Sequence, residues 1–137
     1  TTSEITGQVT PLDLGMEAMV AKAGPCIGLE LLQRPAFHEP HRPRLVGLRA
    51  LDGRSSFLAG SQLTVGPKDR VPMGYVTSSV FGAASGETVA LALAARDVAP
   101  LGTVLWARDP LRGRDVQVRV VAPVHFDPAG ERLRGRY

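Results

Sequence analysis

Three hydroxyl side chains recur at every second position of one apolar segment, and they are the groups in this chain best placed for chemistry. They belong to Tyr75, Thr77 and Ser79. If residues 73–80 form an extended strand, all three share one face, because successive side chains of a strand point to opposite sides. Such a row is either the hydrogen-bonding wall of a polar cleft or a hydrated surface. Ser78 has no basic residue near it in the sequence, so the pattern does not predict a serine nucleophile.

The histidines His38 and His41, with Glu39 between them, raise the question of a metal site. Prolines at positions 35, 40 and 43 argue against a helix that would bring the two rings together, and no third ligand is evident. We therefore expect a loop without a metal. Cys26 is the only cysteine, which excludes an internal disulfide and a cysteine-based metal cluster.

The elements that must position the hydroxyls are short strands bounded by glycines and prolines. Segments 73–80 and 88–94 predict a hairpin joined by a loop of small residues. The second segment has large Val89, Leu91 and Leu93 on one face and only small residues on the other, which lets another layer approach closely. Four further strands are predicted at 45–51, 63–65, 103–107 and 116–121.

A helical lead-in is expected before the first strand. Apolar residues recur at helical spacing between positions 11 and 21, with Thr10 as a candidate N-cap. Gly28 to Gln33 is a second short helical candidate. The sequence therefore predicts a mainly β fold, an antiparallel six-stranded barrel or jelly roll with a short N-terminal helical lead-in.

Composition and charge are those of an ordinary globular protein, with 44% hydrophobic and 21% charged residues. No apolar run approaches the ~18 residues of a membrane-spanning helix, and we expect no signal peptide. The net charge is +3, from 14 Arg and two Lys against 13 acidic residues. This excess is too mild to predict nucleic-acid binding. We expect no nucleic-acid or membrane partner and a cytoplasmic location.

Five segments, taken in order, point to a known family. They read TPLDLGM (10–16), CIGLELL (26–32), RLVGL (44–48), GYVTSSVF with ETVALALAAR (74–81 and 87–96) and FDPAGERL (126–133). Together they resemble the glycine cleavage T-protein (aminomethyltransferase) family. The last segment is similar to its sarcosine oxidase alpha subunit and dimethylglycine dehydrogenase branch. The chain departs from the family in lacking a proline in the loop 81–86 and in having Cys26 at an aromatic, apolar position, where we expect a buried thiol.

The resemblance implies a domain organisation and a cofactor. Residues 1–34 would be the tail end of a folate-binding-domain-like segment, 35–43 a proline-rich linker and 44–137 the C-terminal β-barrel domain. Tetrahydrofolate would be held against the barrel by a folate-binding domain or subunit upstream. The family's catalytic aspartate would lie in that upstream part, so no catalytic residue is expected in this chain.

Five residues match folate-side positions of the family. Arg44 would lie near the folate tail, where a guanidinium pairs well with carboxylates. Tyr75, Thr77 and Ser79 would line the shared cleft, and Asp13 would lie near the pterin. Each has a structural alternative: a surface arginine at a strand start, hydroxyls that satisfy strand and turn backbone, and an aspartate that caps a helix.

Two functions are therefore open. The first is the C-terminal part of a tetrahydrofolate-dependent aminomethyltransferase-like enzyme, which transfers one carbon from glycine, sarcosine or dimethylglycine to folate. In this case the barrel closes the folate cleft. The second is a non-catalytic β-barrel module that packs against a partner domain or subunit. The small-residue face of Thr88, Ala90, Ala92 and Ala94 would suit that contact.

Overall fold

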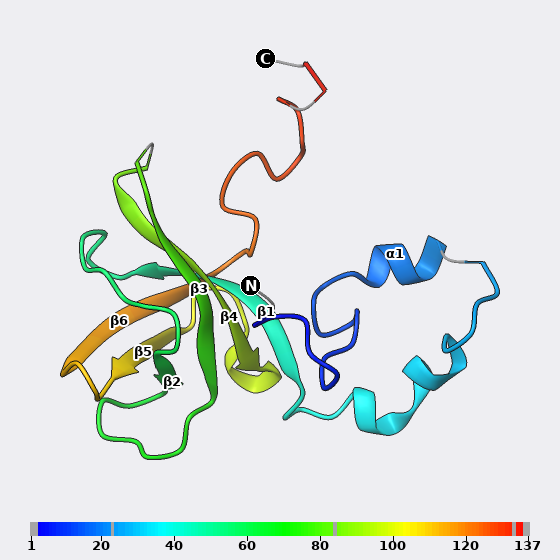
Figure 1. The fold of residues 1–137 in the computed structure, drawn as a ribbon, viewed down its shortest axis with the longest axis horizontal. Helices are drawn as coiled ribbons and strands as arrows, with labels where there is room; N and C mark the ends of the chain where they lie inside the picture. The colour runs from blue at the N-terminus through cyan, green and yellow to red at the C-terminus, as the bar shows by residue number, and fades with distance from the viewer. Residues whose placement is uncertain (1–2, 23, 84, 133, 136–137) are drawn as a thin grey trace.

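Six antiparallel strands close into a barrel in the spatial order β1-β4-β3-β2-β5-β6, which confirms the predicted fold class (Figure 1). This computed structural model describes residues 3–22, 24–83, 85–132 and 134–135. The strands are β1 (Pro43–Ala50), β2 (Gln62–Thr64), β3 (Gly74–Gly82), β4 (Glu87–Ala95), β5 (Val104–Asp109) and β6 (Arg114–Val121). The first and last strands pair with each other, so the sheet closes on itself.

The helical lead-in is shorter than the spacing predicts. Its elements are α1 (Glu17–Lys22), η1 (Glu30–Gln33) and η2 (Pro35–Phe37), and a further turn, η3 (Arg96–Val98), follows β4. The prediction of a helix from residue 11 was wrong, because Gly15 has a φ of 73° that interrupts a helical backbone. Cys26 is exposed, which corrects the expectation of a buried thiol. No helix among residues 3–22, 24–83, 85–132 and 134–135 is long and apolar enough to cross a membrane.

The barrel interior is filled by small and medium-sized side chains from alternating strand positions. Leu48, Leu63 and Leu105 are fully buried there, and Phe57 from the β1–β2 loop joins the same cluster. The small residues of β4 also point inward and are buried. This corrects the expectation that they face a partner. Their size instead lets the opposite wall of a narrow barrel approach β4.

Two glycines mark places where chain segments cross closely. A Cβ at Gly47 would lie 2.3 Å from the carbonyl oxygen of Ala122 and 3.0 Å from the ring of His125, because the segment after β6 runs over the outside of β1. A Cβ at Gly74 would lie 2.2 Å from the carbonyl oxygen of Leu93, and its φ is 155°. Both positions therefore require the absence of a side chain.

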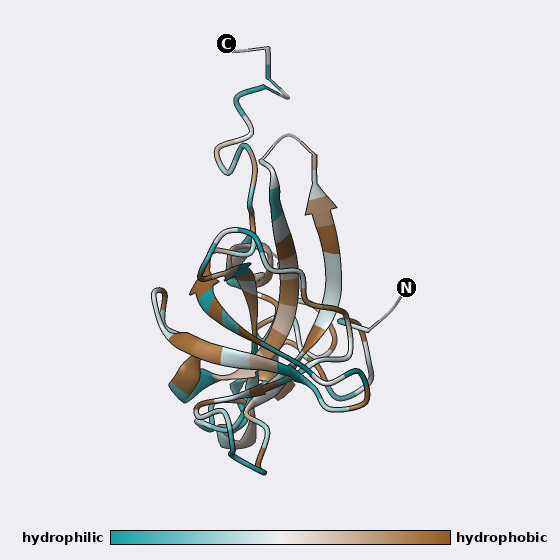
Figure 2. Cartoon of the chain, turned by 90° about the vertical axis from the view of Figure 1, so that its left-hand side faces the viewer, coloured by the Kyte–Doolittle hydropathy of each residue, from teal (hydrophilic) through white to brown (hydrophobic). Residues whose placement is uncertain are grey.

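The β3–β4 hairpin projects beyond the barrel wall, as Figures 1 and 2 show. Its pairing continues to Gly82 and Glu87, whereas the short β2 pairs with β3 only at Tyr75 and Gly74. Hydrophobic bands run up the projecting strands in Figure 2. The outer face of this hairpin carries the groove described below.

Candidate functional site

Asp13 is the most completely buried charged residue among those that the structure describes, with none of its side chain exposed. One of its carboxylate oxygens accepts hydrogen bonds of 2.8 Å from both the backbone N–H and the hydroxyl of Thr10. The guanidinium of Arg42 is hydrogen-bonded to both oxygens. Arg96, after β4, lies 3.5 Å from the other oxygen. Two arginines from the barrel side therefore meet one carboxylate from the lead-in.

This arrangement fixes the ionisation state of Asp13. Burial by itself raises the pKa of a carboxyl group, because the charged form loses its hydration. Here the hydrogen bonds from Arg42 and Thr10 outweigh burial, so the pKa of Asp13 lies below its ordinary value. Backbone contacts add to the connection, since the N–H of Leu45 donates to the carbonyl oxygen of Asp13 at 2.7 Å. We call Thr10, Asp13, Arg42 and Arg96 the Asp13 cluster.

Arg44, predicted near a folate tail, is half-exposed and interacts with the lead-in. Its Nη1 donates to Glu17 Oε1 at 2.5 Å and to the carbonyl oxygen of Leu12 at 3.4 Å. The ion pair with Glu17 is exposed on both sides, and such pairs contribute little to stability. Arg44 could therefore exchange Glu17 for another anionic partner with little loss of stability.

The three predicted hydroxyls do not share one face, because a β-bulge interrupts β3 between Val76 and Ser78. Tyr75 lies on the outer surface, 41% exposed, and its hydroxyl is 3.5 Å from the carbonyl oxygen of Ser3. Thr77 is the extra residue of the bulge and is buried. Ser79 donates a 2.6 Å hydrogen bond to the carbonyl oxygen of Phe57. The expectation of a continuous hydroxyl row was therefore wrong.

Thr77 has an unmet hydrogen-bonding capacity. Its Oγ1 is buried and has no hydrogen-bond partner within 3.5 Å in the described part of the chain. Among the described residues, Thr77 and Ser78 make no hydrogen bond to Glu4, but their hydroxyls favour its ionised carboxylate, Thr77 more strongly than Ser78. The pKa of Glu4 therefore lies below its ordinary value, although burial acts in the other direction. Glu4, Thr77 and Tyr75 therefore form a polar strip where the N-terminal residues pass over β3.

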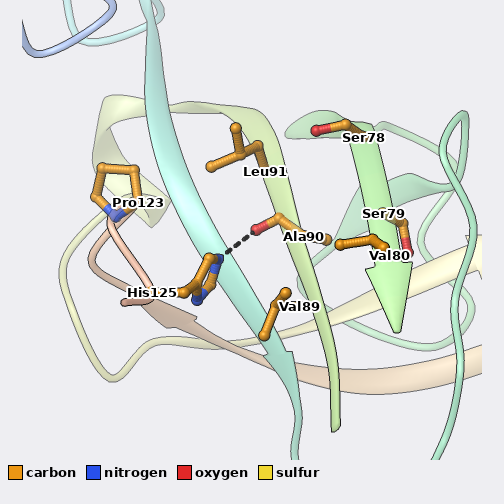
Figure 3. Close-up of a pocket in the computed structure, with 8 residues that line it drawn as sticks. All are labelled: Ser78, Ser79, Val80, Val89, Ala90, Leu91, Pro123 and His125. Atoms are coloured by element: carbon orange, nitrogen blue, oxygen red, sulfur yellow. Dashed lines mark hydrogen bonds between the residues drawn. The ribbon is translucent and has the colours of Figure 1, made fainter. Parts of the chain in front are cut away.

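A groove of about 260 Å³ lies on the outer face of the hairpin. Figure 3 shows Val80, Val89, Leu91 and Pro123 around it, with Ser78 at one end. Val89 and Leu91 of β4 thus line this groove, with Ala90 between them, while the small side chains of β4 fill the barrel. The groove is mainly apolar, so it suits an apolar ligand group or side chain.

His125 is the histidine that lines this groove. Its Nε2 is 3.0 Å from the carbonyl oxygen of Ala90, and because a carbonyl only accepts, Nε2 carries the proton. Its Nδ1 is buried and has no hydrogen-bond partner in the described residues. No hydrogen bond among these residues links His125 to Ser78 or Ser79, so the groove has the parts of a binding site and not of a nucleophile with its base. His125 is not among the residues predicted from the sequence, where only its position just after the last predicted strand could have indicated it.

The described residues contain no group of three or more His, Cys, Asp or Glu side chains that could hold a metal ion. His38 instead places its Nε2 3.2 Å from the carbonyl oxygen of Leu32.

Comparison with known proteins gives a consistent result. The family model of the glycine cleavage T-protein C-terminal barrel domain matches residues 44–127. The chain is 39% identical over 137 residues to a sarcosine oxidase subunit alpha of Rhizobium meliloti, covering 97% of this chain and 14% of that protein. It is 35% identical over 134 residues to a sarcosine oxidase subunit alpha of Corynebacterium sp. (strain P-1), again covering 14% of the relative. The chain therefore spans about a seventh of the length of these relatives.

A solved structure extends the likeness to the fold. The glycine cleavage system aminomethyltransferase T from Bartonella henselae is similar to this chain with a TM-score of 0.67 and 24% sequence identity. The match covers 88% of this chain and 33% of that one. It therefore includes most of the lead-in as well as the barrel.

Proposed function

This chain belongs to the glycine cleavage T-protein C-terminal barrel family, and on that premise we propose that it is the C-terminal part of a tetrahydrofolate-dependent aminomethyltransferase-like enzyme. In this role a one-carbon unit from glycine, sarcosine or dimethylglycine passes to tetrahydrofolate in a cytoplasmic reaction. The barrel closes one side of the folate cleft. The contribution of this chain is to orient the folate, and orientation lowers a barrier by restricting the reactants before they meet.

The observation that carries this proposal is the Asp13 cluster. It joins the TPLDLGM segment, which resembles the end of a folate-binding domain, to the residues that flank the barrel strands. A folate-binding domain that continues from this segment would be held at a defined angle to the barrel. Similarity to two sarcosine oxidase alpha subunits over nearly the whole chain adds support, because the lead-in and barrel occur together in them.

The proposed folate contacts divide into two kinds. Arg44 and Tyr75 are half-exposed and can reach a ligand directly, Arg44 by exchanging Glu17 for a folate carboxylate. Thr77 is assigned to the same kind through a hydroxyl that has no hydrogen-bond partner in the described residues, although its side chain is buried beneath the N-terminal residues near Glu4. Ser79 and Asp13 already use their polar atoms within the chain, so they act by positioning the β1–β2 loop and the lead-in.

A segment exchange tests this assignment. The Rhizobium meliloti subunit, with its matched segment replaced by this chain, is titrated with tetrahydrofolate, and the dissociation constant is measured by calorimetry. Loss of a charge-assisted hydrogen bond predicts roughly 10- to 100-fold weaker binding for Arg44→Gln. Arg70→Gln, at an exposed loop position, is the matched control and leaves binding unchanged. Equal affinity of the parent, Arg44→Gln and Tyr75→Phe proteins would refute the proposed contacts.

A second function is supported by the groove and its surroundings. Val80 and Phe81 on the projecting hairpin are 64% and 63% exposed, and Phe126 beside the C-terminal segment is 66% exposed. Apolar side chains gathered on one side are typical of a contact surface. The alternative is therefore a non-catalytic module that packs against a partner domain or subunit through this side. It predicts that Phe81→Ser weakens assembly of the exchanged subunit, measured by sedimentation, and that tetrahydrofolate affinity stays unchanged.

A further inference from the structure

We propose that Arg49 and Arg119 form a binding site for a small oxyanion, either a carboxylate or a phosphate, on the outer face of β1 and β6. The two residues are direct partners in the antiparallel pairing of these strands. Partners of this kind have Cβ atoms about 5 Å apart on the same face of the sheet. The two arginines therefore leave the sheet from neighbouring positions on one face, and both line the same cavity. Like charges at directly paired positions destabilise a sheet.

The protein supplies only part of that balance. Glu87 Oε2 lies 3.6 Å from Arg49 Nη1, which is an ion pair but not a good hydrogen bond. No carboxylate of residues 3–22, 24–83, 85–132 and 134–135 lies within 4.0 Å of the Arg119 guanidinium. Two positive charges against one negative charge leave a local excess of one.

A buried donor points to where the missing acceptor belongs. The Nε of Arg49 is buried and has no hydrogen-bond partner among the described residues. An unpaired buried donor is unfavourable, and more so on a charged group. An acceptor oxygen from a ligand at this place would satisfy it, and the planar guanidinium fork matches the two oxygens of a carboxylate or phosphate.

The space for such a ligand is present. A cavity of about 300 Å³ is bounded by Arg49, Arg119, Glu87 and Val121, with the β1–β2 turn at Leu51 and Gly53 as its rim. None of these lining residues is among the proposed folate contacts. The proposed oxyanion site is therefore separate from the proposed folate cleft, and its test does not depend on folate binding.

The test is a titration of the 137-residue chain with inorganic phosphate and, separately, with glutarate, at constant ionic strength set with chloride. Binding predicts a saturable rise in melting temperature of about 3 °C at tens of millimolar probe. A response to phosphate alone assigns a phosphate ligand, and a larger response to glutarate assigns a carboxylate. Absence of a saturable response to both overturns the proposal.

Charge reversal gives the sharper comparison. In Arg119→Glu the new carboxylate is the direct partner of Arg49 and takes the place of the ligand, so the unliganded melting temperature is not lowered and the response to both probes is lost. Arg70→Glu changes the net charge equally from an exposed loop and keeps the response. Equal responses of the two variants would show that only general salt effects are at work.

A spectroscopic measurement covers the case in which Arg119→Glu does not fold. In the parent chain, the Arg49 Nε–H resonance shifts saturably with the effective probe, with the same midpoint as the thermal response. In Arg119→Gln, which removes a repelling charge at an exposed position, this shift is reduced at least fivefold at equal probe concentration. A resonance that does not move in the parent chain overturns the assignment.

Discussion

Replacing Asp13 by Asn tests whether the lead-in is held to the barrel by charge. The substitution keeps the shape and an oxygen that can accept from the Thr10 N–H, but it removes the negative charge between Arg42 and Arg96. Breaking a buried ion pair by removing one partner typically costs about 3–5 kcal/mol. Asp13 is fully covered, whereas the side chains of Arg42 and Arg96 are 19% and 27% exposed and can turn toward water.

The expected loss is therefore below that range, at about 2 kcal/mol, because solvent can reach the two arginines. For a chain of this length this corresponds to roughly 6–10 °C in melting temperature if docking and the barrel unfold together. If the lead-in detaches on its own, the barrel melts as before and the loss appears only locally. The amide of Leu45 reports that local event, because it donates to the carbonyl oxygen of Asp13.

The assay combines thermal melting with amide hydrogen exchange. We expect Asp13→Asn to lower the protection factor of the Leu45 amide about 30-fold, the exchange equivalent of 2 kcal/mol. Glu17→Gln is the control, since it also removes a carboxylate from an arginine but at an exposed pair, and it should cost less than about 0.5 kcal/mol. A native melting temperature together with native Leu45 protection in Asp13→Asn would refute the reasoning.

The same carboxylate gives the docking contact a pH dependence. The pKa of Asp13 is lower in the folded protein than its ordinary value. Its contribution is therefore complete above that ordinary value and is lost as the pH falls through the folded pKa. Leu45 protection should decrease on acidification in the parent chain and change less in Asp13→Asn.

Three further predictions concern single contacts. Gly47→Ala places a Cβ 2.3 Å from a backbone oxygen of the segment after β6. It should therefore lower the free energy of unfolding, measured by urea denaturation, by about 1–3 kcal/mol. An unchanged free energy of unfolding would contradict this close contact between β1 and the segment after β6. The pKa of Asp52 is lowered from 3.8 to about 2, first by the Ser55 hydroxyl, so its stabilising effect is complete above pH 3.8 and is lost as the pH falls to about 2. Ser55→Ala should raise this pKa in a carboxyl NMR titration, and an unchanged titration would exclude the contact. Ser79→Ala removes the 2.6 Å hydrogen bond to the carbonyl oxygen of Phe57 and should lower the free energy of unfolding by about 1 kcal/mol, measured by thermal melting. An unchanged melting temperature would show that this hydrogen bond does not hold the β1–β2 loop.

The barrel could be predicted because its strands alternate and end at glycines and prolines. The hairpin predicted at 73–80 and 88–94 appears as β3 (Gly74–Gly82) and β4 (Glu87–Ala95), with bounds that differ by one or two residues. The small residues of β4 do pack closely, as expected, but they pack into the barrel core and not against another domain. Alternation alone does not tell the inside of a barrel from an interface, since both favour close approach.

The polar residues were harder to place because their positions depend on contacts between distant segments. The bulge between Val76 and Ser78 shifts the pairing of β3 with β4 by one residue, and no pattern within the β3 sequence predicts it. In the Asp13 cluster, Asp13 meets Arg96, which lies 83 residues further along the chain. A motif such as TPLDLGM predicts a turn with a cap, and only the folded chain adds the two arginines.

The crossings over β1 explain the composition of that strand. A strand of a barrel with one face in water alternates, whereas Leu45, Val46, Gly47 and Leu48 form an unbroken apolar run. The Leu45 amide is hydrogen-bonded to the lead-in, and the segment after β6 lies against Gly47, so β1 has contacts outside the barrel as well as with the core. Its amides should then be the slowest in the chain to exchange, and the outer covering and the core should come apart in separate steps as the protein unfolds.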